Sequence, residues 1–350
     1  MNKNKISELL DRRVVLQHEP TPIRRLHHIS ASLNKEVFCK DDSHISAIYG
    51  GSKVRKLEFI FQDALAKRAK KLVTVGSWAS HHVLATALFS KGLNLKLDAV
   101  VLPQPHSELV DHAMHHAMSA GANLSPASSE LIAALKILKI MTLASIKGER
   151  PYFINLGGSS AYGVLGSVLG AFELLEQVDA NMAPKEGAIY VALGSGSTAA
   201  GLALGLVLAN RPRPIKAIQV TSSLVVNRFV LNRLLMAGAK LLVEPEQQKE
   251  LVSKAAQLIE IDEQMLGRGY GYPTSQSAIA MDEAQLDELL LDPIYTSKVF
   301  AAIQQSPQDG LPVLYWHTES FPLAAIDSNL SLPQWYRKAK LKAVPSLSKS

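Results

Sequence analysis

The sequence predicts an α/β protein with mostly parallel sheets. Its 350 residues are 47% hydrophobic and 19% charged, which is typical of a folded globular chain. Short apolar runs rich in Val and Ile alternate with longer segments whose apolar residues recur three and four positions apart. The first pattern is typical of buried strands and the second of helices, and their alternation indicates a parallel sheet with helices on both faces. The length is sufficient for two domains.

The individual elements follow from these two patterns in chain order. The predicted strands stop at or near a Gly, Pro or Ser and cover residues 72–76, 99–102, 188–193 and 215–220. The predicted helices between them cover residues 58–69, 82–91, 162–177 and 198–210. A further strand-like segment around Cys39, the single cysteine, predicts a core position without an internal disulfide.

Charge and hydropathy exclude several classes of protein. The net charge of +6 is spread thinly, and its densest clusters, residues 67–71 and 337–342, indicate a solvated helix end and a basic tail rather than a nucleic-acid site. The longest apolar region, 131–146, is interrupted by Lys136 and Lys139, so we expect no membrane span. The N-terminus has no apolar stretch of signal-peptide length, which predicts a cytoplasmic protein.

Two glycine-rich runs, 156–163 and 193–201, stand out because functional groups in α/β sheets gather where strands end and helices begin. The second run follows a predicted strand and opens an apolar helix, so its backbone amides predict a phosphate cradle. It is neither a P-loop nor a dinucleotide fingerprint, and an ordinary strand-to-helix turn remains the alternative. The expected cradle consists of Gly194, Ser195, Gly196, Ser197 and Thr198.

A lysine follows a Gly-Gly-Ser turn in the N-terminal third, where residues 49–59 read Tyr-Gly-Gly-Ser-Lys-Val-Arg-Lys-Leu-Glu-Phe. At the start of a helix, Lys53 lies in a positive field that favours its neutral amine, the form that makes a Schiff base. Without further context, Lys53, Arg55 and Lys56 also fit a merely charged helix start. The residues alone leave open whether Lys53 or Lys56 bonds a cofactor.

A histidine cluster in residues 111–118 places His112, His115 and His116 near one helical face, an arrangement that attracts zinc. No Cys or carboxylate at ligand spacing accompanies them elsewhere in the segment, so we expect an exposed polar face and no metal. Met114 and Met118, four residues apart, are expected to pack in the core.

Residues 50–58, Gly-Gly-Ser-Lys-Val-Arg-Lys-Leu-Glu, resemble the Gly-Gly-Asn-Lys-x-Arg-Lys-Leu-Glu segment of one family of pyridoxal-phosphate (PLP) enzymes. This is the family of 1-aminocyclopropane-1-carboxylate (ACC) deaminases and D-cysteine desulfhydrases. Further matching motifs follow in the family's order, so that the resemblance covers roughly residues 20–325. These motifs are Thr21-Pro22-Ile23, Lys40-Asp41-Asp42, Ala79-Ser80-His81-His82, Gly157-Gly158-Ser159, 194–202, 270–273, 292–298 and 314–318.

The resemblance implies a two-domain fold of the tryptophan-synthase-β-like type (fold type II), in which each domain is an open, mostly parallel sheet flanked by helices. The large, cofactor-binding domain would comprise residues 1–54 and 165–350, and the small domain residues 55–164. A homodimer is expected from the family.

The same resemblance implies a set of site residues. Lys53 would carry PLP as a Schiff base and then act as the base that removes the substrate α-proton. The cradle 194–198 would hold the phosphate, and His81 would lie beside the ring in place of the family's Asn. Thr296 and Thr318 complete the expected cofactor contacts. The expected substrate side consists of Ser80, His82, Gly158, Tyr270 and Tyr295, of which Ser80 and Tyr295 are also expected to be catalytic.

The residue that faces the ring nitrogen bears on the reaction. Family members acting on ACC tend to have Glu after the Tyr of the 292–298 motif, whereas this chain has Thr296, as desulfhydrases do. A hydroxyl leaves the ring neutral, which suffices when a good leaving group departs from the β-carbon. The resemblance therefore favours β-elimination from a small amino acid, with D-cysteine giving pyruvate, ammonia and hydrogen sulfide.

Two alternatives remain. One is ACC deamination, or elimination from another β-substituted amino acid. The other, from a different class, is a non-catalytic PLP-binding paralogue, because Glu319-Ser320 replaces a Gly-Gly pair of the family near the cofactor.

Overall fold

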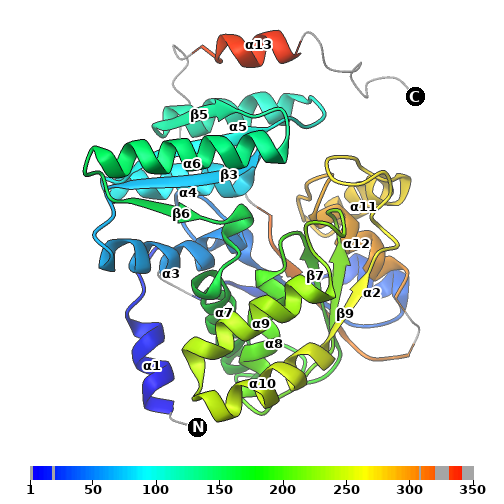
Figure 1. The fold of residues 1–350 in the computed structure, drawn as a ribbon. Helices are drawn as coiled ribbons and strands as arrows, with labels where there is room; N and C mark the ends of the chain where they lie inside the picture. The colour runs from blue at the N-terminus through cyan, green and yellow to red at the C-terminus, as the bar shows by residue number, and fades with distance from the viewer. Residues whose placement is uncertain (1–2, 18–19, 307–308, 320–330, 341–350) are drawn as a thin grey trace. The chain divides into compact units, whose positions relative to one another are not determined.

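The computed structural model describes residues 3–17, 20–306, 309–319 and 331–340 (Figure 1). The chain divides into two compact units. Unit 1 comprises Met1–Phe59 and Ser159–Phe321, and unit 2 comprises Ile60–Gly158 and Pro322–Ser350. Each unit contains its own sheet, and the α/β class predicted from the sequence is confirmed.

Unit 1 contains a six-stranded sheet in the order β1-β2-β10-β7-β8-β9. All neighbouring pairs are parallel except β1–β2. The central strand β7 is apolar along its whole length, as expected of a parallel strand with helices on both faces. The strands are β1 (Ile23–Arg25), β2 (Val37–Asp41), β7 (Ala188–Leu193), β8 (Ile215–Gln219), β9 (Ile259–Asp262) and β10 (Val313–His317).

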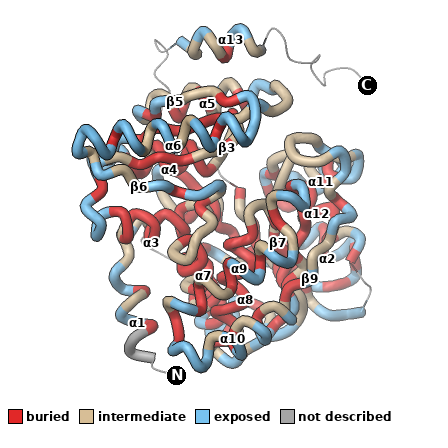
Figure 2. Tube along the Cα trace, in the orientation of Figure 1, coloured by how far each residue is buried: buried red, intermediate tan, exposed pale blue. Residues whose placement is uncertain are grey.

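The helices of unit 1 pack closely, and α8 is buried along most of its length (Figure 2). A Cβ at Gly201 would lie 2.4 Å from the carbonyl oxygen of Val164, so α7 and α8 approach to backbone contact only because this residue is glycine. The elements are α1 (Lys3–Asp11), α2 (His27–Leu33), η1 (Asp42–His44), the start of α3 (Ser52–Ala66), α7 (Ala161–Asp179), α8 (Ser197–Leu208), α9 (Arg228–Leu242), α10 (Pro245–Leu258), α11 (Ser275–Gln285) and α12 (Thr296–Gln304).

Unit 2 contains a four-stranded sheet in the order β5-β4-β3-β6, and all its pairs are parallel. Its strands are β3 (Lys71–Ser77), β4 (Lys96–Leu102), β5 (Ala122–Pro126) and β6 (Pro151–Ile154). Its helices are the rest of α3, α4 (His81–Gly92), α5 (Glu108–Ser119), α6 (Glu130–Ile146), η2 (Leu156–Gly158) and α13 (Gln334–Lys340). None of the described helices is long and apolar enough to cross a bilayer.

The histidines of α5 differ from the expected exposed face. His112 is exposed, but His116 is buried, so the prediction was wrong for this residue. Burial, together with His112 and His115, lowers the pKa of His116, which favours a neutral ring in the core. Among the described residues no cluster of three or more metal-ligating side chains is found. Met114 and Cys39 are buried as predicted, whereas Met118 is half-buried.

Candidate active site

Lys53 lies in the first turn of α3, and the two glycines before it are required by the backbone. A Cβ at Gly50 would lie 2.0 Å from the carbonyl oxygen of Ser43, and Gly51 has a φ of 84°. The N–H of Gly51 donates to the carbonyl oxygen of Asp42 at 2.7 Å, which fixes the turn that leads into α3. The Lys53 side chain that follows is half-buried.

The amine of Lys53 is shifted toward its neutral form. Burial lowers the pKa of Lys53, and the carboxylates of Asp292 and Glu319 act in the opposite direction. An amine that loses its proton easily is a better nucleophile and can also act as a base. Lys53 therefore has the chemistry expected of a Schiff-base lysine.

Lys56, one turn further along α3, is buried with a relative exposure of 3%. Burial and the nearby Lys53 lower the pKa of Lys56 well below its usual value. No hydrogen bond from its amine to another described residue is found. A buried lysine in this state is stabilised when an anion binds beside it.

The N-terminus of α8 follows β7 directly through Gly194, Ser195 and Gly196. Gly196 is the N-cap with a φ of 91°, and no side chain caps the helix. The N–H groups of the first turn have no acceptor within the helix, so they are available to an anion, which the positive end of the helix dipole also favours. The predicted cradle is thus an uncapped helix N-terminus whose first residues are Ser197 and Thr198.

The two glycine-rich runs meet in unit 1 through Ser159. Its Oγ lies 2.9 Å from the carbonyl oxygen of Ser195, 2.7 Å from Ser195 Oγ and 3.2 Å from Ser197 Oγ. On the other side of the turn, Thr221 Oγ1 donates to the carbonyl oxygen of Gly194 at 2.7 Å. These contacts hold the loop before α8 in place.

Thr296 begins α12 and is held by two acidic residues. Asp292 accepts from the backbone N–H groups of Ile294, Tyr295 and Thr296 at 2.8, 2.6 and 2.9 Å, so its carboxylate organises the start of the helix. Thr296 Oγ1 also lies 3.0 Å from the carboxylate of Glu319. The sequence predicted only the hydroxyl of Thr296 at this position, and the structure adds the carboxylate of Glu319 beside it.

Thr318, also expected at the ring, is half-buried directly after β10, between His317 and Glu319. Ser320, the second member of the Glu319-Ser320 pair, lies outside the described residues.

The two tyrosines expected on the substrate side contact each other. Tyr295 Oη donates to Tyr270 Oη at 2.9 Å, and the rings pack edge to face with centroids 5.9 Å apart. Burial and the neighbouring Tyr270 raise the pKa of Tyr295 well above its usual value, so its phenol stays protonated near neutral pH. A Cβ at Gly194 would lie 3.3 Å from Tyr295 Cε1, which places this ring beside the cradle.

Ser80 and His81 lie where β3 gives way to α4. Ser80 is the N-cap of α4, and its Oγ accepts from the N–H of Val83 at 3.3 Å. His81 is the first residue of the helix and is half-buried. Both therefore lie at a helix N-terminus, where backbone N–H groups favour a carboxylate.

His82 and Gly158 are neighbours within unit 2. His82 is buried, and its Nε2 lies 3.0 Å from Thr74 Oγ1. Gly158 has a φ of 70°, and a Cβ there would lie 3.5 Å from His82 Cε1. His82 is thus held from one side by Thr74 and covered from the other by Gly158.

The sequence-predicted residues therefore form two sets, one in each unit. Unit 1 holds Lys53, the cradle 194–198, Tyr270, Tyr295, Thr296 and Thr318, and unit 2 holds Ser80, His81, His82 and Gly158. Sequence reasoning did not assign site roles to Ser159, Asp292 or Glu319. Ser159 and Asp292 lie inside quoted motifs and could have been found there, whereas Glu319 stood out only as a departure from the family pattern.

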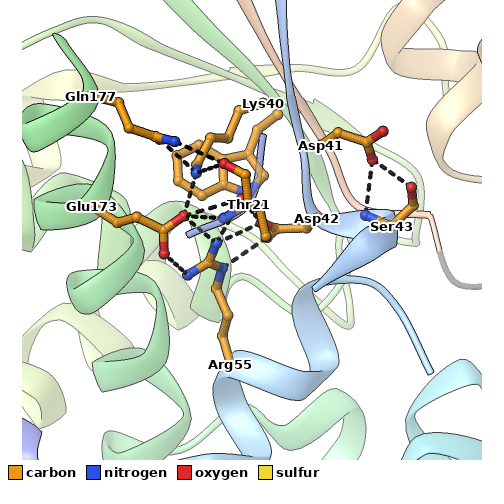
Figure 3. A network of polar contacts seen from close by, with 9 residues as sticks. Thr21, Lys40, Asp41, Asp42, Ser43, Arg55, Glu173 and Gln177 are labelled. Atoms are coloured by element: carbon orange, nitrogen blue, oxygen red, sulfur yellow. Dashed lines mark hydrogen bonds and ion pairs between the residues drawn. The ribbon is translucent and has the colours of Figure 1, made fainter. Parts of the chain in front are cut away.

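A network of buried charges includes Arg55 at the start of α3 (Figure 3). Arg55 donates to Asp42 at 3.0 and 2.7 Å and to Glu173 at 2.8 and 3.1 Å. Lys40 also donates to Glu173, and to the carbonyl oxygen of Thr21 at 2.8 Å. Three motifs of the resemblance thus meet here, and they hold the segment that carries Lys53.

Comparison with known proteins assigns the chain to a family. Residues 14–319 match the model of the family described as pyridoxal-phosphate dependent enzyme. The D-cysteine desulfhydrase of Klebsiella pneumoniae (strain 342) is 32% identical over 321 residues, which cover 89% of this chain and 94% of that protein. The chain belongs to the family of pyridoxal-phosphate dependent enzymes.

Solved structures give the same assignment. A crystal structure of an ACC deaminase homologue is 28% identical, with a TM-score of 0.75 over 98% of this chain and 100% of that one. Serine racemase from Dictyostelium discoideum, at 16% identity, shares the fold with a TM-score of 0.61 over 90% of this chain and 96% of that one. The predicted family and its fold type are thus confirmed.

The residues present fit PLP, the cofactor of this family. The cofactor has an aldehyde that bonds an amine and a phosphate that needs several donors. Unit 1 offers an amine of lowered pKa at Lys53, an uncapped helix N-terminus at Gly196 and a buried amine at Lys56.

Proposed function

We propose that this protein uses PLP to eliminate the β-substituent of a small amino acid, and that D-cysteine is its substrate. D-cysteine and water would give pyruvate, ammonia and hydrogen sulfide. The observation that carries the proposal is the half-buried Lys53 amine, of lowered pKa, in the same unit as the open N-terminus of α8. The similarity to a D-cysteine desulfhydrase supports this choice of substrate.

When bound, PLP supplies an aldehyde that captures an amino group and a ring that takes up the electron pair left by proton removal. Lys53 would bind the aldehyde carbon, and its Nζ would later take the α-proton. The N–H groups of residues 194–198 would bind the phosphate, with the Lys56 amine as a further donor. Thr296, Thr318 and His81 would contact the ring.

The substrate would be bound by the remaining predicted residues. Ser80, with the N–H groups at the start of α4, would bind the carboxylate. Tyr295 remains protonated and would give a proton to the departing sulfur, with Tyr270 holding its hydroxyl in position. His82 and Gly158 would shape the pocket around the α-carbon.

Two further features belong to this proposal. We expect a homodimer and a cytoplasmic location, as the family resemblance and the N-terminal sequence respectively suggest. Sedimentation of the purified holoprotein tests the first, and fractionation of cells that express the tagged chain tests the second.

The main test is the visible spectrum of the PLP-loaded protein before and after addition of D-cysteine. We expect an absorption band that changes on addition while sulfide and pyruvate appear. Lys53→Ala should lose both the band and the products, whereas the exposed-lysine control Lys254→Ala should keep them. A protein that shows no band in the presence of PLP would contradict the cofactor assignment.

ACC deamination is the second candidate, favoured by the carboxylate of Glu319 beside Thr296 and by the similarity to an ACC deaminase homologue. A band that changes with ACC, with release of ammonia and a 2-oxo acid but without sulfide from D-cysteine, would favour it. A band that responds to none of the β-substituted amino acids tested would favour a PLP-binding paralogue without turnover.

A further inference from the structure

The hydroxyl of Thr296 is buried between two carboxylates. Thr296 Oγ1 lies 2.6 Å from Asp292 Oδ2 and 3.0 Å from Glu319 Oε2. The backbone N–H of Asp292 points at the same group and lies 2.8 Å from both Thr296 Oγ1 and Glu319 Oε2. Thr296 and Glu319 have relative exposures of 1% and 3%. The buried Glu319 and the half-buried Asp292 thus share one buried hydroxyl.

This arrangement fixes what Thr296 can offer to a further group. A threonine hydroxyl has one proton and two lone pairs, and an ionised carboxylate only accepts. The proton of Thr296 is therefore directed toward Asp292 or Glu319. One lone pair of its oxygen accepts from the backbone N–H of Asp292, so only the second lone pair is left to accept from a further partner. A partner bound there must be a donor, and the adjacent carboxylates favour a donor with a positive charge.

The position of Glu319 places this acceptor at the same sheet edge as the cradle. Strand β10 ends two residues before Glu319, and its parallel neighbour β7 ends one residue before Gly194. The carboxylates of Asp292 and Glu319 also lie close enough to the Lys53 amine to oppose the effect of burial on its pKa. The acceptor, the cradle and the lysine thus belong to one site in unit 1.

PLP has three polar features besides its phosphate, namely the aldehyde, the ring hydroxyl and the ring nitrogen. Two nitrogens can carry a positively charged N–H, namely the ring nitrogen and the nitrogen that Lys53 contributes on bonding the aldehyde carbon. The second already has the neighbouring ring hydroxyl as an acceptor, which leaves the ring nitrogen as the donor in need of one. We propose that Glu319, acting through the hydroxyl of Thr296, keeps the ring nitrogen of bound PLP protonated. This inference rests on the proposed PLP site, and it makes Glu319 a positioning residue that acts through Thr296.

A protonated ring draws electrons more strongly than a neutral one. The reaction then depends less on a good leaving group at the β-carbon. The substrate class therefore extends from D-cysteine to amino acids with poorer leaving groups, including ACC. The acid that the sequence lacks at position 296 is supplied from position 319, in the segment that follows β10.

Other titratable groups lie near Asp292 and Glu319, but none of them replaces these two carboxylates as the acceptor for the hydroxyl proton of Thr296. Burial lowers the pKa of His317, while nearby carboxylates oppose this, and burial lowers the pKa of Lys298 to about 8. Tyr315 Oη lies 3.3 Å from the carbonyl oxygen of Thr296 and 2.9 Å from His317 Nδ1. The charged and titratable neighbours among the described residues are Lys53 on α3, Asp292 and Tyr295 before α12, Lys298 on α12, and Tyr315 and His317 on β10.

The test is ¹⁵N NMR of the full-length protein reconstituted with PLP labelled at the ring nitrogen. We expect a chemical shift typical of a protonated pyridine at pH 7. Glu319→Gln should lower the pH at which this nitrogen loses its proton by about 1–3 units, because one nearby opposite charge is removed. The exposed Glu283→Gln serves as the matched control and should leave the titration unchanged.

Two variants at position 296 show whether the hydroxyl transmits the effect. Thr296→Val should shift the titration of the ring nitrogen as Glu319→Gln does. Thr296→Ser keeps the hydroxyl and should therefore keep the wild-type titration. These variants also keep the test decisive if Glu319→Gln fails to fold. Two results would overturn the inference: a neutral ring nitrogen in the wild type, or a ring-nitrogen titration that neither Glu319→Gln nor Thr296→Val shifts. If the protein still binds PLP, either result leaves the proposed function intact. Failure to bind PLP at all would overturn the proposed function instead.

Discussion

Helix α3 carries two buried basic side chains within one turn, and they differ in what surrounds them. Arg55 donates to Asp42 and Glu173, and these carboxylates outweigh the effect of burial and raise its pKa. Lys56 lies on the same helix with no acceptor among the described residues, and burial lowers its pKa well below the usual value. The comparison teaches that burial alone does not distinguish a structural charge from a functional one. The presence of a fixed counter-charge distinguishes the structural charge from the functional one.

The largest expected effect comes from breaking the paired cluster. Glu173→Gln leaves Lys40 and Arg55 with Asp42 as their remaining carboxylate in the network, so we expect a loss of about 3–5 kcal/mol in the free energy of unfolding. Urea denaturation followed by circular dichroism measures it. Glu176→Gln, an exposed residue of the same helix, is the matched control and should be neutral. Equal stability of the two variants would show that the network is not structural.

The same cluster predicts how stability depends on pH in acid. Burial alone would raise the pKa of Glu173, but Arg55 and Lys40 lower it to about 2, below the ordinary 4.5. A carboxyl with a lowered pKa stabilises the folded state above pH 4.5 and loses this contribution as pH falls toward 2. We expect a loss of about 3 kcal/mol from this group in wild type. Glu173→Gln should lack that part of the decline in urea titrations at successive pH values.

Substitution of Lys56 should change the free energy of unfolding in the opposite direction to substitution of Glu173. Lys56→Met removes a buried amine that has no acceptor among the described residues, so we expect the protein without PLP to gain about 1 kcal/mol in the free energy of unfolding at pH 7. Because the pKa of Lys56 is lowered, its wild-type contribution to stability rises with pH up to about 10.5, and the variant should lose this rise. Affinity for PLP should fall. A destabilised variant would mean that the amine has a partner in the folded protein.

The smallest effect is expected at an exposed ion pair. Lys254 and Glu250 lie 2.7 Å apart on α10, and both side chains are more than half exposed. Exposed pairs of this kind contribute little because water and salt screen them. Lys254→Met should therefore leave urea unfolding unchanged within error, and a loss as large as that of Glu173→Gln would contradict the distinction between the clusters.

Much of the fold could be predicted from the sequence because its signals are local. The apolar run 188–193 coincides with β7, and the predicted helix 162–177 lies within α7. The apolar pattern indicated helix α3 only from residue 58, because charged residues in its first turns obscure that pattern. The Gly-Gly-Ser turn placed the helix start at Lys53, and the helix begins at Ser52. These charges are buried by partners from other parts of the chain.

The site could be predicted only where a motif carried it. Lys53 and the cradle at 194–198 were expected from glycines next to reactive or anion-binding groups. The acceptor formed by Thr296 and Glu319 joins residues 23 positions apart, and no local pattern indicates such a contact. Likewise, nothing local showed that Lys40 and Arg55 would share Glu173.

The charge network of Figure 3 also bears on how the chain is made. Arg55 precedes its partner Glu173 by 118 residues and Lys40 precedes it by 133. At a synthesis rate of about 5–20 residues per second, the ribosome exposes the two cations on the order of ten seconds before their shared carboxylate. Until α7 emerges, the start of α3 would bury cations with too few counter-charges, so unit 1 cannot complete its folding.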